Sequence, residues 1–247
     1  MVWLGLAAAG LSITFVGMLR GLVGGLVLRY SFFYAYLLST FVGNALVVIF
    51  WSLHSASIDR WYWVLQLLTL LIGCGIILEI FRHALSPYGG AEKFATAVGL
   101  VTLGGVFCFA FLYRVLAPPS SQALFELERN VRTVQAILLF GILAVVSYYG
   151  IPLGKNLKGL IVGYGLYIVT SLAALAIRAY AGPRFNATWN VVQPLSFVVS
   201  LGIWLVAFWS YHPNPAPDPG IPLEDDYEAL AKRTRRALAE LTRGVRP

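Results

Sequence analysis

Charged and polar residues with a spacing suited to chemistry stand at the start of an apolar segment near residue 132. Glu126, Glu128, Arg129 and Arg132 lie close together, and Glu128, Arg132 and Gln135 are spaced four and three apart. That spacing places the last three on one helical face, with the glutamate before the arginine as an ion pair prefers. Such a pair can close the end of a helix, or its arginine can bind an anion. The sequence leaves both alternatives open.

Polar residues at a comparable expected depth occur in three further apolar segments. They can form an outward-facing cavity for a small molecule or a lipid headgroup, with Arg132 and Arg178 facing its anionic group. Alternatively, these residues form hydrogen bonds that hold neighbouring helices together. This candidate ligand or lipid cluster comprises Gln66, Glu128, Arg132, Gln135, Arg178, Asn190 and Gln193.

A second pair of chemically competent residues is Glu79 and His83, four apart on one helical face. Two such ligands can begin a metal site, or can serve an enzyme at the membrane surface. The remaining histidines, His54 and His212, are expected elsewhere, so the sequence predicts no metal site. It also contains none of the common hydrolase, zinc-protease or phosphate-loop motifs, and we predict no catalytic residue and no cofactor.

The composition identifies the solvent that surrounds these residues. Of the 247 residues, 59% are hydrophobic and 12% are charged, whereas soluble domains have roughly 45–50% apolar and about 25% charged residues. The basic residues lie between apolar runs and near the C-terminus, as membrane topology requires. We therefore predict an integral membrane protein that does not bind nucleic acid.

Seven segments are long and apolar enough to be predicted as membrane-crossing helices. The predicted fold is all-α: a polytopic seven-transmembrane-helix bundle over residues 1–211. Short connections between the segments favour antiparallel neighbours, and Gly159-x-x-x-Gly163 matches a pattern for close helix packing. Cys74 and Cys108 are predicted to be buried thiols at different depths, without a disulfide. The segments are 2–19, 31–53, 61–82, 94–116, 132–151, 157–178 and 188–210.

The remaining residues are predicted to form a proline-rich linker over 212–222 and a cytoplasmic amphipathic helix over 223–247. The candidate docking residues Tyr227, Leu230, Leu238 and Leu241 belong to one narrow apolar stripe of this helix. A partner protein, a second copy of the chain or lipid headgroups can bury the stripe. Acids and bases are balanced along the helix, whereas membrane-surface helices are usually strongly basic, so we favour a protein contact.

Lysine and arginine positions give the expected orientation. The loops on the two sides of the membrane carry equal numbers of lysine and arginine residues. The basic C-terminal tail therefore decides which side has more of them. Because basic residues collect on the cytoplasmic side, we expect the N-terminus outside and the C-terminus inside a bacterial inner membrane.

Three short stretches, "ERNVRTVQ", "IPLGKNLKG" and "RHALSPYG", resemble uncharacterised seven-helix bacterial integral membrane proteins. This resemblance implies a fold and assigns no site residues. More distantly, the chain resembles the seven-helix sensory modules of bacterial receptors, although it carries no kinase, cyclase or methyl-accepting domain. The expected function is that of a non-enzymatic sensory or accessory subunit of a larger membrane assembly, docked through the C-terminal helix. The alternative is a transporter or lipid-handling protein that uses the outward-facing polar cluster.

Overall fold

A computed structural model describes residues 2–52, 58–116, 121–216 and 221–244, and over these residues the chain is helical and contains no strand. The all-α prediction is therefore confirmed for the described part of the chain. The elements are α1 (Val2–Val23), α2 (Ser31–Ser52), α3 (Ile58–Leu85), α4 (Gly89–Leu116), α5 (Ser121–Tyr148), α6 (Lys155–Ala181), the 3-10 turn η1 (Gly182–Phe185), α7 (Asn186–Ala207) and α8 (Leu223–Gly244).

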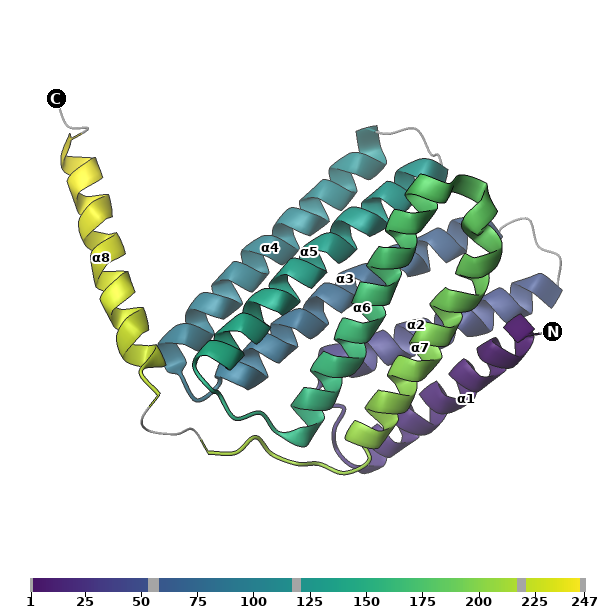
Figure 1. The fold of residues 1–247 in the computed structure, drawn as a ribbon, viewed down its shortest axis with the longest axis horizontal. Coiled ribbons are helices and arrows are strands. Elements are labelled where there is room, and N and C mark those ends of the chain that lie inside the picture. The colour runs from purple at the N-terminus through teal and green to yellow at the C-terminus, as the bar shows by residue number, and fades with distance from the viewer. Residues whose placement is uncertain (1, 53–57, 117–120, 217–220, 245–247) are drawn as a thin grey trace.

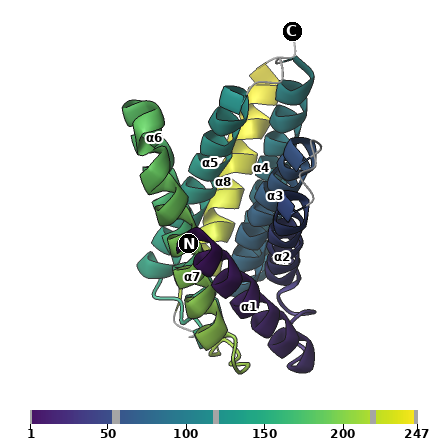
Figure 2. The same cartoon turned by 90° about the vertical axis from the view of Figure 1, so that its right-hand side faces the viewer.

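Helices α1 to α7 run alongside one another as a bundle, and α8 projects from one end of it (Figure 1). Helix α3 packs against α2, α4, α5 and α6, while α7 packs between α1 and α6. Figure 2 shows α1 and α7 together on one side of the bundle. We call the end from which α8 projects the tail-side end, and the other the opposite end.

Among the described residues, three helices are long and apolar enough to cross a membrane, through the stretches Val64–Leu85, Glu126–Tyr148 and Lys155–Arg178. Large apolar side chains also cover the outside of the bundle: Val101 is 76% exposed and Phe140 is 74% exposed. Soluble monomers rarely expose large contiguous apolar surfaces. Such an exterior suits hydrocarbon as the surrounding solvent.

Helix α5 begins earlier than its apolar residues indicate. Its apolar part was predicted from residue 132, whereas the helix starts at Ser121. The additional turns are polar but contain good helix formers, which hydropathy cannot detect. As a result, Glu128 and Arg132 lie inside α5 and not at its entrance.

The tail-side end is held together by side chains that bind backbone groups. Asn156, fully buried at the start of α6, donates to the carbonyl oxygens of Ala207 (2.8 Å), the last residue of α7, and of Ser210 (2.9 Å) just beyond it. Asn214 accepts from the Gly154 amide and donates to the His83 carbonyl. The beginning of the proline-rich linker is therefore bound to the bundle.

Both cysteines are free in the structure. Cys74 is buried in α3, as expected, but the prediction that Cys108 is buried is wrong, because its side chain lies exposed on α4. In a membrane-embedded bundle an apolar side chain can face lipid as readily as protein, so hydropathy alone does not predict which one it faces.

Candidate functional site

A buried ion pair on α5 is the centre of the candidate site. Arg132 Nη2 lies 2.9 Å from Glu128 Oε1, and the arginine side chain is only 4% exposed. Arg132 Nε also donates to the same carboxylate oxygen at 2.9 Å. The pair forms because residues four apart meet on one helical face, and packing of α5 against α3 and α6 turns this face inward.

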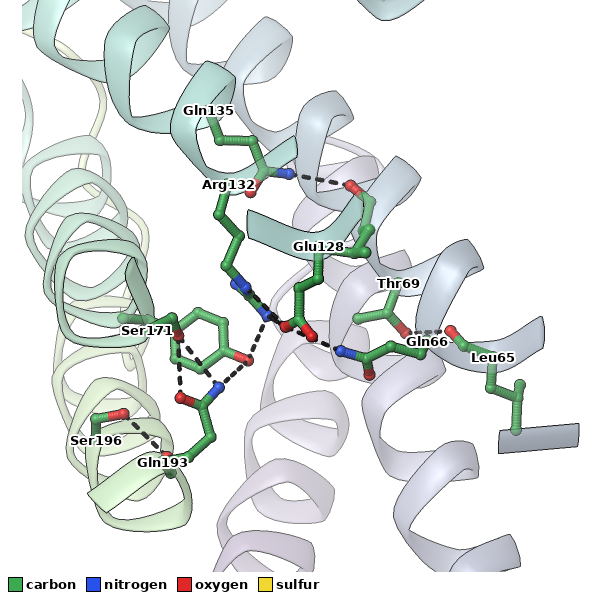
Figure 3. Close-up of polar contacts among 11 residues, drawn as sticks. Leu65, Gln66, Thr69, Glu128, Arg132, Gln135, Ser171, Gln193 and Ser196 are labelled. Atoms are coloured by element: carbon green, nitrogen blue, oxygen red, sulfur yellow. Dashed lines mark hydrogen bonds and ion pairs between the residues drawn. The ribbon is translucent and has the colours of Figure 1, made fainter. Parts of the chain in front are cut away.

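Two neighbouring helices supply polar partners to this pair, and a third joins the network through one of those partners (Figure 3). From α3, Gln66 Nε2 donates to Glu128 Oε1 at 3.2 Å. From α6, Tyr167 accepts from Arg132 Nη2 at 3.2 Å, and the guanidinium lies over the tyrosine ring at 4.9 Å from its centroid. From α7, Gln193 Nε2 donates to the Tyr167 hydroxyl oxygen at 3.3 Å. The network thus joins α3, α5, α6 and α7.

Two members of the network were not predicted from the sequence. Tyr167 is the link between Arg132 and Gln193, and the fully buried Ser171 exchanges hydrogen bonds with Gln193 at 3.1 and 3.3 Å. They are four residues apart on α6, which places both on one helical face. That spacing was the available signal, but an isolated tyrosine or serine in an apolar helix is too common to stand out in a sequence.

Gln135 lies one turn beyond Arg132 and makes a separate link between α5 and α3. Its Nε2 donates to the Leu70 carbonyl at 3.0 Å and approaches Cys74 Sγ at 3.4 Å. Its oxygen Oε1 is buried and has no hydrogen-bond partner within the described structure. Gln135 therefore ties two helices together near the pair.

The structure does not bring all of the predicted cluster together. Arg178 is partly exposed and lies about two turns beyond Ser171 on α6. The backbone of Asn190 belongs to α7, but its side chain lies outside the described residues. The assembled part of the predicted cluster consists of Gln66, Glu128, Arg132 and Gln193, with Gln135 beside it.

Glu79 and His83 have structural roles in the fold. The Glu79 carboxylate accepts hydrogen bonds from the backbone amides of Phe32 (3.1 Å) and Phe33 (3.0 Å), in the first turn of α2. His83 Nε2 lies 2.8 Å from the carbonyl oxygen of Arg29. Both side chains are thus engaged by the backbone around the start of α2. Over the described residues no group of three or more potential metal ligands forms.

This arrangement predicts that Glu79 stabilises the start of α2. We expect Glu79→Ala to lower the free energy of unfolding by about 1–3 kcal/mol, because two buried amides lose their acceptor. Unfolding of the purified protein in detergent measures the change. Arg82→Ala, an exposed substitution on the same helix, is the control. Equal stability of Glu79→Ala and the control would contradict the capping role.

The charged groups of the α5 network bind each other and leave no unpaired charge for a ligand. The two charges neutralise each other and point toward one another (Figure 3). An anionic ligand at Arg132 would have to replace Glu128, which would leave a buried carboxylate without its partner.

Comparison of this chain with protein families, curated proteins and solved structures finds no match.

Proposed function

We propose that this chain is a non-enzymatic accessory or sensory subunit of a larger assembly in a bacterial inner membrane. In this proposal α1 to α7 cross the membrane, the N-terminus lies outside, and α8 is a cytoplasmic docking element. The polar network on α5 serves as a rigid link between four helices. The observation that carries the proposal is the placement of α8, which is fixed at its start and exposed over the following turns.

Contacts with α4 and with the residue that follows α5 support a fixed start for α8. Leu223 is buried, and Glu224 Oε1 accepts a hydrogen bond from the amide of Gly90 at 2.8 Å, at the start of α4. Tyr149 donates to Asp226 Oδ2 at 3.0 Å. Desolvation and this hydrogen bond raise the pKa of the Tyr149 hydroxyl, which keeps it a donor. The Tyr227 ring lies against Phe94 of α4, with centroids 6.2 Å apart.

Beyond these contacts α8 leaves the bundle and runs crosswise to it (Figure 1). Leu230, the next member of the apolar stripe, is 61% exposed. Tyr227 is already half-buried against α4, while the side chains of Leu238 and Leu241 lie outside the described residues. A helix that is held away from its own bundle and exposes a leucine of its apolar stripe suits a groove on another protein.

The charges of α8 indicate the chemistry of that partner. Residues 232–236 include Lys232, Arg233, Arg235 and Arg236 and contain no acid. Complementary charges steer association and set the register of a bound helix. We therefore propose a protein partner with an apolar groove bordered by carboxylates.

Leu230→Glu tests this proposal. Because an apolar contact is lost and a charge is placed on the stripe, we expect about tenfold or greater weakening of the assembly. The size of the native complex in gently solubilised membranes measures the weakening of the assembly. Site-specific crosslinking from residue 230 identifies the molecule that contacts α8. Ala229→Glu introduces the same charge at an exposed position beside the stripe and is the matched control.

Three results would contradict the docking role of α8 in a hetero-assembly. An unchanged complex in Leu230→Glu would remove α8 from the interface. Crosslinks only to a second copy of the chain would make the contact a homodimer. Crosslinks only to lipid would place α8 on the membrane surface.

The alternative function, a transporter or lipid-handling protein, would use the same α5 network as a binding site. It requires Arg132 to exchange the Glu128 carboxylate for an anion of the ligand. The closed network does not favour this exchange, and substitution of Arg132 separates the two functions.

A further inference from the structure

A cleft between α1, α2 and α7 lies apart from the α5 network. It is partly open to the surroundings and is lined mainly by apolar side chains. Ile13 and Gly17 contribute from α1, Leu37 from α2 and Leu201 from α7. Thr14, Arg20 and Tyr34 line it as well, and the Thr14 hydroxyl already donates to the Gly10 carbonyl oxygen at 2.7 Å. An apolar cleft that also contains Arg20 and Tyr34 matches an amphipathic ligand.

Arg20 provides a positive charge in the last turn of α1. Its Nε donates to the carbonyl oxygen of Trp209 at 2.6 Å, and its guanidinium lies 5.6 Å from the centre of the indole ring. Within the described part of the chain no carboxylate forms an ion pair with it. The remaining guanidinium donors are therefore available to an anion.

Tyr34 provides a hydroxyl group without a partner. The residue is 5% exposed, and its buried hydroxyl oxygen makes no hydrogen bond within the described structure. Its ring lies against Gly21, where a Cβ atom would overlap it. A buried hydroxyl normally finds a hydrogen-bond partner. Since Tyr34 lines the same cleft as Arg20, a ligand that carries an acceptor oxygen would supply one.

The surroundings of Arg20 resemble the level of lipid headgroups. Trp209 is 53% exposed and Tyr211 is 41% exposed, just beyond the end of α7. Arg29 lies over the Tyr211 ring, with its guanidinium 4.1 Å from the ring centre. Exposed tryptophan and tyrosine side chains with arginines nearby are typical of the membrane interface. An anion bound at Arg20 would lie at this level, and the cleft would extend from it toward the membrane interior.

We propose that the α1/α2/α7 cleft binds an anionic phospholipid from the leaflet at the tail-side end. The phosphate group binds Arg20, a glycerol-ester carbonyl accepts a hydrogen bond from Tyr34, and an acyl chain lies along the apolar lining. Arg20 supplies the charge complementarity, and the acyl chain covers apolar surface that protein leaves open. This site is independent of the docking role of α8.

The test uses the full-length protein in detergent with added phosphatidylglycerol or phosphatidylcholine. We expect phosphatidylglycerol to raise the Tm more than phosphatidylcholine does. Tyr34→Phe should weaken phosphatidylglycerol binding about threefold to tenfold, as expected for the loss of one hydrogen bond. Without lipid, Tyr34→Phe should unfold at the same or a higher Tm, because the hydroxyl has no protein partner.

Two variants at the same end of the bundle serve as controls. Tyr30→Phe removes a hydroxyl outside the cleft, and Arg29→Gln removes a neighbouring charge. Both should retain phosphatidylglycerol binding, whereas Arg20→Gln should lose most of it. Because Arg20 also binds the Trp209 backbone, Tyr34→Phe remains the decisive variant if Arg20→Gln fails to fold.

Three outcomes would overturn the proposal. Unchanged phosphatidylglycerol binding in Tyr34→Phe would show that Tyr34 does not donate to the ester carbonyl. Equal stabilisation by phosphatidylcholine would remove the preference for an anionic lipid. Equal stabilisation by inorganic phosphate alone would identify a simple anion site that does not use the apolar cleft.

Discussion

Arg132→Leu is expected to lower the free energy of unfolding by about 3–5 kcal/mol, because it leaves the Glu128 carboxylate buried without its counter-charge. Both side chains are almost fully buried and meet at 2.9 Å. Loss of Arg132 also removes one of the two donors to the Tyr167 hydroxyl. Chemical unfolding in detergent measures the loss. Arg129→Leu, on the same helix and more exposed, is the control and should change stability by less than about 1 kcal/mol.

A double variant separates a structural pair from a ligand site. Glu128→Leu/Arg132→Leu removes both charges, so it should recover much of the stability lost in the single variant. If the pair is a structural link, the double variant should also assemble normally. If Arg132 binds a ligand, the double variant should be folded but inactive in binding or transport. Full stability of Arg132→Leu alone would contradict the structural role of the pair.

Gly163→Leu is expected to be the other strongly destabilising substitution, with a loss of about 3 kcal/mol or more from overpacking of the α6/α7 contact. A Cβ atom at Gly163 would lie 2.7 Å from Cδ1 of Trp204, and the neighbouring Gly159 faces Ala207 equally closely. Trp204 has little room to move, because it is fully buried and packs against Phe33, with centroids 5.3 Å apart.

Alanine at the same position isolates the packing effect. Alanine favours a helix over glycine by about 1 kcal/mol, so propensity alone predicts that Gly163→Ala stabilises the protein. The contact with Trp204 predicts the opposite sign. Gly141→Ala is the matched control, because a Cβ atom there meets nothing within 4 Å. Unfolding of the two variants gives the comparison, and stabilisation by Gly163→Ala would contradict close packing at this position.

Four members of the α5 network belong to the cluster predicted from the sequence, and the role of that cluster as a ligand or lipid site stays a prediction. Glu128 and Arg132 are a local pair, since four residues of helix fix their relative position. Gln66 and Gln193 join them through packing of other helices. Tyr167 could not be chosen in advance as the connecting residue, because the rotation of α6 decides which of its tyrosines faces Arg132.

The contacts of Glu79 and His83 with the backbone could not be predicted for a related reason. The two residues do share a face of α3, as their spacing indicates. Their partners are backbone groups around the start of α2, and every helix start offers free amides of this kind. Sequence spacing within α3 therefore cannot distinguish a cap on another helix from half of a metal site.

The sequence by itself determined the helical class, the apolar character of the surrounding solvent and the amphipathic nature of α8. These properties follow from composition and from periodicity along a single segment. Tertiary structure alone decided that the polar network closes on itself, that Arg20 and Tyr34 share a cleft, and that α8 leaves the bundle after Tyr227. Each depends on how helices distant in sequence are rotated and tilted against one another, and side-chain packing between them sets that geometry.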